Sequence, residues 1–515
     1  MFRKIMNFIK YMKYSPQNAP YPKPKVDKVM EKIPSDINVI RRHIEKIGHE
    51  TGGVIIKPFV IHHNHTEALM VYIDGMADTA SVEFHVLRPL MSKKIKESAG
   101  EKVDEDISSN LLKEIITAAN SFTIDSMNVA MEYLFEGNAL VFIEDTSQAI
   151  VIDAKGWAIR PVEEPQTDTV IRGPREGFVE DLQTNIALLR RKFKSPKLRF
   201  ESMFVGRYSR TEINICYISG KADEEMLKEM RRRIARIDID AVLDSAYIEQ
   251  YIEDSPLSLF PLVGSTEKPD IVLGKILEGR IAILCDGSPF VLTAPQLFIE
   301  QIQSGADYYR RNVFSFTIRA LRLLALFITT TLPAVYVAAQ SFHHEFIPFE
   351  LFISMAASRE GLPFSSFIEA LLMIIIFELI KEAGIRMPKP IGQAVSIVGA
   401  VVLGQAAVEA NITSPLMVIV VALTAISGFI VPSLDETNTF IRLFLLVTAN
   451  FLGFYGLAFA VMILVIYMCN LKSFGINYLS PLAPISLSHL TDTYARLPLW
   501  VIFKDKKSLF QQHKK

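Results

Sequence analysis

The sequence predicts an α+β soluble N-terminal region, made of two related α/β subdomains, followed by an all-α polytopic membrane domain. Three observations predict this fold class. Long apolar stretches fall between about residue 314 and residue 470. The charged residues, 22% of the chain, crowd into the part that precedes these stretches. In that first part, short apolar segments bounded by Gly, Asn and Asp alternate with segments of helical periodicity.

The N-terminal region mixes strands and helices. Residues 54–61, 68–73 and 139–143 are rich in β-branched and aromatic side chains, as strands are. Residues 107–120 and 126–135 carry apolar residues at helical spacing.

Two sequence patterns occur twice, in the same order. Tyr72-Ile-Asp-Gly-Met-Ala-Asp recurs as Tyr217-Ile-Ser-Gly-Lys-Ala-Asp, and the pattern that starts at Gly137 recurs in outline at Gly279. Such an echo predicts two related subdomains in tandem. The expected organisation is a basic, proline-containing tail (1–35), a first subdomain (36–155), a linker (156–180), a second subdomain (181–310), a transmembrane helical domain (311–470) and a basic C-terminal tail (471–515).

Several segments approach the roughly 20 apolar residues that cross a bilayer. They are 320–339, 364–380, 391–410, 415–431 and 443–468. The arginines before and at the start of the first segment place the N-terminal region in the cytoplasm by the positive-inside rule. The apolar run 346–357 is too short to cross, and we expect it in the interface or dipping into the membrane.

Five crossings would leave the basic C-terminal tail on the outer side, which conflicts with its lysines. One segment must therefore be re-entrant or split in two. Asn450, Gly453 and Gly456 are candidates for a break in the long last segment.

Composition and motifs exclude several function classes. The formal net charge is −1, so the chain as a whole lacks the excess of Lys and Arg that binds nucleic acid. Cys216, Cys285 and Cys469 lack CxxC spacing and predict neither disulfides nor zinc. The chain carries no nucleotide-binding or catalytic signature that we recognise, so we expect neither an enzyme nor a cofactor. The basic residues 1–32 are either a disordered tail or a tether to anionic lipid.

Small residues recur every four positions along the third apolar segment and predict a face for close helix packing. They are Gly392, Ser396, Ala400 and Gly404. Gln405 and Glu409 lie on an adjacent stripe and, with Glu369 of the second segment, are candidates for an ion path. The alternative for Glu409 is an interhelical hydrogen bond or a carboxylate that reaches the interface.

Two further groups of polar residues have a structural interpretation beside a functional one. Arg319 and Arg322 could pair with Glu369 or contact lipid phosphates. The histidines at 62, 63 and 65 could bind a metal, but alternation along a strand would separate them and no Cys or Asp cluster supports them. We therefore favour an exposed turn and predict no metal site.

Four longer motifs are specific enough to indicate a protein family. They start at Val170 (Val-Ile-Arg-Gly-Pro-Arg-Glu-Gly-Phe-Val-Glu-Asp-Leu-Gln-Thr-Asn), at Gly279 (Gly-Arg-Ile-Ala-Ile-Leu-Cys-Asp-Gly-Ser-Pro-Phe), at Arg359 (Arg-Glu-Gly-Leu-Pro-Phe) and at Glu382 (Glu-Ala-Gly-Ile-Arg-Met-Pro-Lys-Pro-Ile-Gly-Gln-Ala). With these motifs in order, the chain resembles the A subunits of GerA-type bacterial spore germinant receptors from about residue 50 to about residue 490.

The resemblance implies a multi-pass protein of the spore inner membrane, with its N-terminal domain on the cytoplasmic side. It implies a transporter-like B subunit that binds the nutrient and a lipoprotein C subunit as partners, besides membrane lipid. It also implies a homo-oligomer, expected as a pentamer, that forms a germinant-gated channel for monovalent cations. The alternatives are a non-conducting scaffold or relay subunit and, less favoured, a secondary transporter.

Overall fold

The computed structural model describes residues 32–61, 66–91, 121–154, 172–386, 403–485 and 492–493. They form two compact units. The first contains the described residues up to Pro256 together with Val263–Pro295, and it holds two five-stranded sheets. The second contains Leu257–Leu262 and the described residues from Gln296 onward, and it is helical apart from one short hairpin.

The first sheet has the strand order β1-β2-β4-β5-β3, and every pairing in it is antiparallel. Its strands are β1 (Val54–Ile61), β2 (Thr66–Ile73), β3 (Ser121–Ile124), β4 (Ala139–Ile143) and β5 (Ala149–Ile152). The helices around it are α2 (Ile37–Thr51), α3 (Thr79–Val82), the π-helical turn η2 (Glu83–Leu87), α4 (Arg88–Met91) and α6 (Met127–Phe135). The strands predicted at 54–61 and 139–143 and the helix predicted at 126–135 are confirmed.

Alternation along β4 explains why this sheet is covered on both faces. All of its residues are buried. Leu140 and Phe142 pack in a cluster with residues of α2 and α6, whereas Val141 and Ile143 pack with residues of α3, η2 and α4. Because successive strand residues point to opposite faces, the result is a three-layer arrangement with the helices on both sides.

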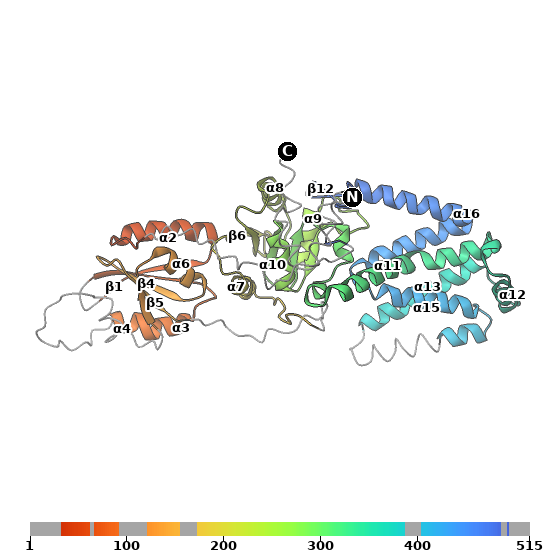
Figure 1. Cartoon of the computed structure of the whole chain (residues 1–515), viewed down its shortest axis with the longest axis horizontal. Helices are drawn as coiled ribbons and strands as arrows, with labels where there is room; N and C mark the ends of the chain where they lie inside the picture. Colours follow the sequence, from red (N-terminus) through yellow and green to blue (C-terminus); the bar gives the residue numbers. More distant parts are fainter. Residues whose placement is uncertain are drawn as a thin grey trace, which may run out of the picture. The chain divides into compact units, whose positions relative to one another are not determined.

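The second sheet repeats the first, with the order β6-β7-β9-β10-β8 and antiparallel pairing throughout. Its strands are β6 (Leu198–Val205), β7 (Thr211–Ile218), β8 (Gly264–Thr266), β9 (Ile281–Cys285) and β10 (Val291–Ala294). Its helices are α7 (Leu182–Lys192), α8 (Glu224–Ala235), α9 (Ser245–Ile252) and α10 (Pro269–Leu277). The two sheets, which both lie in the first unit, therefore share one strand order. Figure 1 shows the elements of this unit.

The repeated sequence patterns mark the same two turns in each copy. After β2 and β7, Gly75 and Gly220 take a positive φ, and the aspartates Asp78 and Asp223 cap the helices that follow. Before β4 and β9, Gly137 and Gly279 also take a positive φ where α6 and α10 end. The echo thus records turn and capping chemistry, together with one buried isoleucine at the end of each strand, Ile73 and Ile218.

Arg190 of α7 connects the two subdomains. Its Nη2 donates to the carbonyl oxygens of Thr51 and Gly52 at 3.1 and 2.7 Å, so it satisfies the end of α2. Its guanidinium lies 4.9 Å from the centre of the Phe200 ring. Gly53 has φ +67°, which strains any residue with a Cβ, and a Cβ there would also lie 2.7 Å from Nη1. Burial lowers the pKa of Arg190 to about 10.

The second unit is a bundle of helices. Its long helices are α11 (Asn312–Ser341), α13 (Ser366–Arg386) and α16 (Asp435–Asn470). Its shorter elements are η3 (Phe298–Gln301), η4 (Gly305–Tyr309), η5 (His344–Phe346), α12 (Phe349–Ser358), α15 (Pro415–Gly428), η6 (Pro432–Leu434) and the hairpin of β11 (Lys472–Ser473) with β12 (Ile476–Asn477). Residues 403–409 are also helical.

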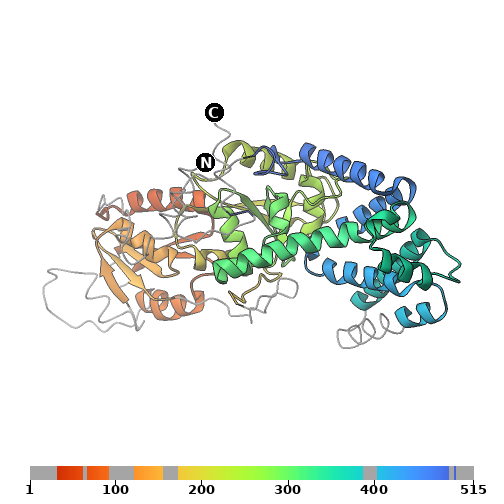
Figure 2. The ribbon, with the colours of Figure 1, turned by 45° about the vertical axis from the view of Figure 1, so that its right-hand side comes forward.

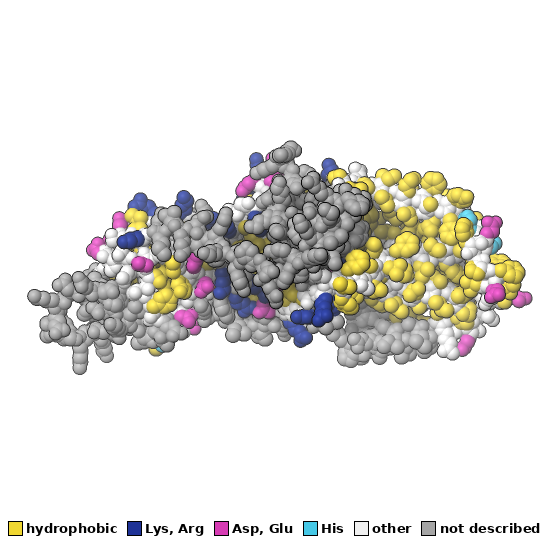
Figure 3. All heavy atoms as spheres, viewed as in Figure 1, with side chains coloured by type: hydrophobic (Ala, Val, Ile, Leu, Met, Phe, Trp, Pro, Cys, Tyr) yellow, Lys and Arg dark blue, Asp and Glu magenta, His cyan; other side chains and the backbone are white. Residues whose placement is uncertain are grey.

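Two helices in the described part of the chain are long and apolar enough to cross a membrane, namely α11 and the 39-residue stretch Pro432–Asn470. In their most apolar windows only 33% and 22% of the residues are buried within the protein. Hydrophobic side chains accordingly cover much of the visible face of this unit (Figure 3). So large an apolar surface indicates that something other than water covers it.

Helix α16 is broken at Gly453, one of the residues predicted to mark a break. Gly453 has φ 57° and ψ −140°, which is not helical. Thr437, near the start of α16, donates to the Leu259 carbonyl oxygen, and the Tyr467 hydroxyl, near its end, lies 3.4 Å from the Ser258 hydroxyl. Both ends of α16 therefore meet the same short segment. The helix is a hairpin whose arms meet at Gly453 (Figures 1 and 2).

Candidate functional site

A buried carboxylate lies where three elements of the helical unit meet. Glu369 is in the first turn of α13, and only 1% of it is exposed. Its Oε1 accepts from Nη2 of Arg359 at 2.9 Å, and its Oε2 accepts from the backbone N–H of Ser414 at 3.2 Å. Since Ser414 is the N-cap of α15, the carboxylate also faces the positive end of that helix.

Arg359 comes from the turn that follows α12. Besides Glu369, its guanidinium donates to the Ser366 hydroxyl and to the Phe364 carbonyl oxygen. One arginine thus ties the end of α12 to the start of α13. Sequence analysis identified Glu369 but not this partner. The available signal was the position of Arg359 at the head of one of the four family motifs.

Several buried polar atoms around this ion pair have no hydrogen-bond partner. They are Arg359 Nε, Gln340 Oε1 and Thr413 Oγ1. The Tyr336 side chain forms hydrogen bonds with Gln340 and Ser414 and interacts electrostatically with Glu369 and Arg359. Gln340 and Ser414 therefore lie near the ion pair. We call Glu369, Arg359, Gln340 and Thr413 the Glu369 cluster.

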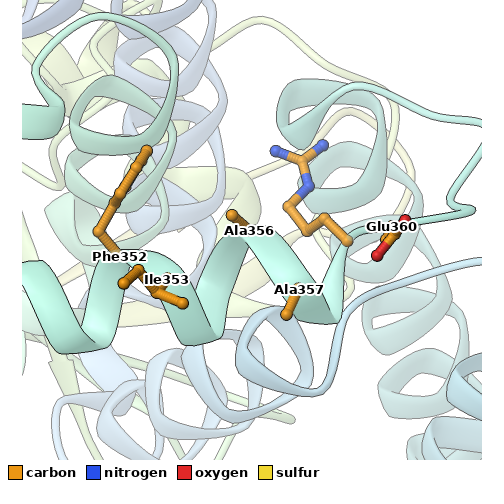
Figure 4. A pocket seen from close by; sticks show the side chains of 6 residues that line it. Phe352, Ile353, Ala356, Ala357 and Glu360 are labelled. Carbon is orange, nitrogen blue, oxygen red and sulfur yellow. The ribbon is translucent and has the colours of Figure 1, made fainter.

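Two hollows flank α12 beside this cluster. One, of about 260 Å³, is lined by Gln340, His344, Phe352, Met355, Ala356 and Arg359. The other, of about 470 Å³, is lined by Phe352, Ile353, Ala356, Ala357, Arg359 and Glu360. The small side chains of Ala356 and Ala357 leave this side of α12 open (Figure 4).

Arg319 and Arg322 do not pair with Glu369. Arg319 Nε lies 3.1 Å and Arg322 Nη1 2.8 Å from Oδ2 of Asp307, which is fully buried. Arg319 Nη1 also lies 3.1 Å from Oδ1 of Asp492. The headgroup alternative is equally wrong for Arg319, whose side chain has no exposed surface. These arginines instead fasten α11 to η4 and to residues 492–493.

A third charge cluster joins α13 to α16. Lys381 Nζ lies 2.5 Å from Oε2 of Glu378 and 3.0 Å from Oδ2 of Asp435. Glu378 Oε1 in turn accepts from Nη2 of Arg442 at 2.8 Å. The cluster is at the opposite end of α13 from Glu369, as their positions in the helix require. Glu378 therefore serves helix packing.

Gln405 and Glu409 pair with each other and not with Glu369. Gln405 Nε2 donates to Glu409 Oε1 at 2.9 Å, and both side chains are exposed. Gly404, one of the small residues, lies close to Val418: a Cβ added to Gly404 would be 3.4 Å from Cγ1 of Val418. The other three residues of that ladder, Gly392, Ser396 and Ala400, lie outside the described residues.

The remaining candidates offer little chemistry. The histidines at 62, 63 and 65 lie outside the described residues. Within the described ranges, no group of three His, Cys, Asp or Glu side chains could hold a metal ion. Burial raises the pKa of Cys216, and burial together with Asp244 and Asp286 raises the pKa of Cys285 to about 12, so both thiols stay protonated and unreactive.

Comparison with known proteins decides the family. The model of the family described as Bacillus/Clostridium GerA spore germination protein matches residues 42–508. The chain belongs to this GerA family. It is 40% identical over 477 residues to spore germination protein KA of Bacillus subtilis, covering 91% of this chain and 86% of that protein.

Other GerA family relatives are similar over comparable lengths. Spore germination protein GerLA of Bacillus cereus is 38% identical, covering 88% of this chain and 92% of that protein. An uncharacterized membrane protein of B. subtilis, YfkQ, is 40% identical, covering 84% and 83%. The crystal structure of the N-terminal domain of the A subunit of the Bacillus megaterium spore germinant receptor GerK3 is 31% identical, with a TM-score of 0.42, covering 53% of this chain and 99% of that one.

Proposed function

We propose that this chain is a membrane subunit of a nutrient-sensing spore germination receptor and forms a gated path for monovalent cations. Membership of the GerA family and the names of the relatives support the receptor assignment. The apolar surface of the helical unit supports a place in a membrane, which we take to be the spore inner membrane. The names of these relatives indicate no catalytic function.

The break at Gly453 supports an even number of crossings. Gly453 divides the 36 residues of α16 into two arms of nearly equal length. An arm of about 17 residues is roughly 26 Å long, close to the thickness of the hydrocarbon core. Counting each arm, α11, α13, α15 and the segment that ends at residue 409, we propose six crossings. The chain then enters and leaves the membrane on one side.

Basic residues support the orientation of that side. Arg310 and Arg311 precede α11, and Lys381 and Arg386 close α13. Lys381 contacts Asp435 at the start of α16, so the start of this hairpin and the end of α13 share one end of the helical unit. By the positive-inside rule this end faces the cytoplasm, together with the N-terminal subdomains and the basic C-terminal tail.

The exposed pair of Gln405 and Glu409 carries the proposal of an oligomeric ion path. An amide and a carboxylate on an apolar segment are costly in contact with lipid and normally face protein or water. In the single chain both side chains are exposed instead of being buried against protein. A ring of copies, with a pentamer as the expected size, would place this pair against a neighbour or a central water path. Glu369, which is buried inside the protomer, would form a second cation-binding position on that path.

The partners follow from the family. We propose that a transporter-like B subunit binds the nutrient and that a lipoprotein C subunit completes the receptor. The alternative is that this chain is a non-conducting scaffold or relay subunit. One observation favours that alternative: Glu369 is fully paired with Arg359 and Ser414, as a purely structural carboxylate would be.

Charge reversal at Glu409 tests the proposed path. We expect Glu409→Lys to slow potassium efflux during nutrient-triggered germination without lowering the amount of receptor in spores. Glu436→Lys is the matched control, because Glu436 is an exposed carboxylate of the same unit, in the first turn of α16, and lines neither hollow beside Arg359. Equal efflux from both variants and the parent would remove Glu409 from the path.

A further inference from the structure

The oxygen atoms around Glu369 exceed what its ion pair needs. Thr413 is 1% exposed, yet its hydroxyl has no hydrogen-bond partner. Gln340 Oε1 is buried and equally unpaired. Leaving a buried polar atom unpaired is costly, so such atoms at one place indicate a second occupant.

The identity of these atoms indicates what that occupant is. The Glu369 cluster offers a carboxylate, an amide oxygen and a hydroxyl, all of them hard oxygen ligands that suit alkali-metal cations rather than softer metals. A single carboxylate balances a single positive charge. In this structure the guanidinium of Arg359 supplies that charge.

We propose that Glu369, Gln340 and Thr413 form a monovalent-cation site, and that Arg359 fills this site in the closed conformation. When Arg359 withdraws, a cation replaces it on the same carboxylate. This inference rests on the proposed cation path and assigns the residues of the cation-binding position at Glu369.

The packing of α12 allows Arg359 to withdraw. Met355 is the single buried side chain of this ten-residue helix. The two hollows on its flanks both border Arg359. Gly361, two residues after Arg359, has φ +91° and space around it. A helix with so few buried contacts moves at little cost.

Glu369 stays in place during this movement. Its Oε2 is held by the Ser414 N–H at the start of α15, an interaction that involves neither α12 nor Arg359. The carboxylate and Thr413 therefore remain together, while Arg359 moves with α12.

The direct test is cation-dependent melting of the purified full-length chain in detergent. Melting temperature is compared in potassium chloride and in N-methyl-D-glucamine chloride at equal ionic strength, so that screening is the same. For Arg359→Gln we expect the melting temperature to be about 2–4 °C higher in potassium chloride, as for a ligand present at several times its dissociation constant. The parent, whose site is filled by Arg359, should show no difference.

Two double variants separate the site from general charge effects. Arg359→Gln with Thr413→Val should lose the potassium effect, because one ligand is gone. Arg359→Gln with Glu360→Gln should keep it, since Glu360 is an exposed carboxylate beside the cluster. The proposal is overturned if Arg359→Gln melts identically in both salts or if both double variants behave alike.

A second measurement covers the case in which Arg359→Gln does not fold. In proteoliposomes, Thr413→Val should reduce rubidium flux several-fold, whereas Thr413→Ser, which keeps the hydroxyl, should conduct like the parent. Equal flux through all three chains overturns the site while leaving the proposed path intact. No flux through any of the three chains refutes the proposed path and, with it, the site that rests on that path.

Discussion

Substitution of Gly453 tests the helical hairpin most sharply. At φ 57° and ψ −140° a residue with a Cβ is strained, which costs about 1–3 kcal/mol. A Cβ would also lie 2.7 Å from Cε1 of His343 and 3.0 Å from Cβ of Phe342, at the end of α11. With this crowding, we expect Gly453→Ala to destabilise the helical unit by about 2–4 kcal/mol. For a unit of this size, melting should fall by roughly 5–15 °C.

The assay is thermal unfolding of the full-length chain in detergent, followed by circular dichroism. Gly404→Ala is the control, because a Cβ there would lie 3.4 Å from Val418, an ordinary contact in a helix. The double variant Gly453→Ala with His343→Ala should recover the steric part of the loss but not the backbone part. If Gly453→Ala melts within about 1 °C of the parent, the break in α16 is not required, and the reasoning fails.

Three further predictions concern the N-terminal unit. Arg190→Lys should cost about 1.5–3 kcal/mol in urea unfolding, because an ammonium cannot reproduce the paired donors to α2 or the stacking on Phe200. Lys268→Met should raise the melting temperature, since the Lys268 ammonium is 1% exposed and lacks a hydrogen-bond partner; a fall would contradict this. Burial alone would raise the pKa of Glu201, but hydrogen bonds from Arg231 and Tyr217 lower it overall. Its stabilising contribution should therefore be complete above about pH 4.5 and be lost as the pH falls through the lower folded value, and Glu201→Gln should flatten that part of the stability profile.

Sequence patterns predicted the N-terminal region well where local chemistry decides structure. The strands at 54–61 and 139–143 are rich in β-branched and aromatic side chains, and both appear as expected. The tandem repeat was visible because the glycines and capping aspartates of two turns recur. The antiparallel strand order could not be predicted, because it depends on contacts between strands far apart in the chain.

The candidate site was predicted less completely. Glu369 stood out as a carboxylate at membrane depth, and Gly453 as a candidate break, because each is unusual in its local sequence. The partner of Glu369 was not predictable, since Arg359 lies ten residues away across a turn whose path depends on tertiary packing. Arg319 was assigned to the wrong partners for the same reason, because Asp307 and Asp492 reach it only through the fold.

The central claim is that the helices of this chain assemble around a cation path. The most direct measurement is rubidium uptake by liposomes that contain the purified full-length chain alone. We expect uptake above that of empty liposomes, with a further increase when Arg359→Gln frees Glu369. Oligomers inserted in sealed liposomes that take up no rubidium, with or without that substitution, would contradict the claim and favour the scaffold.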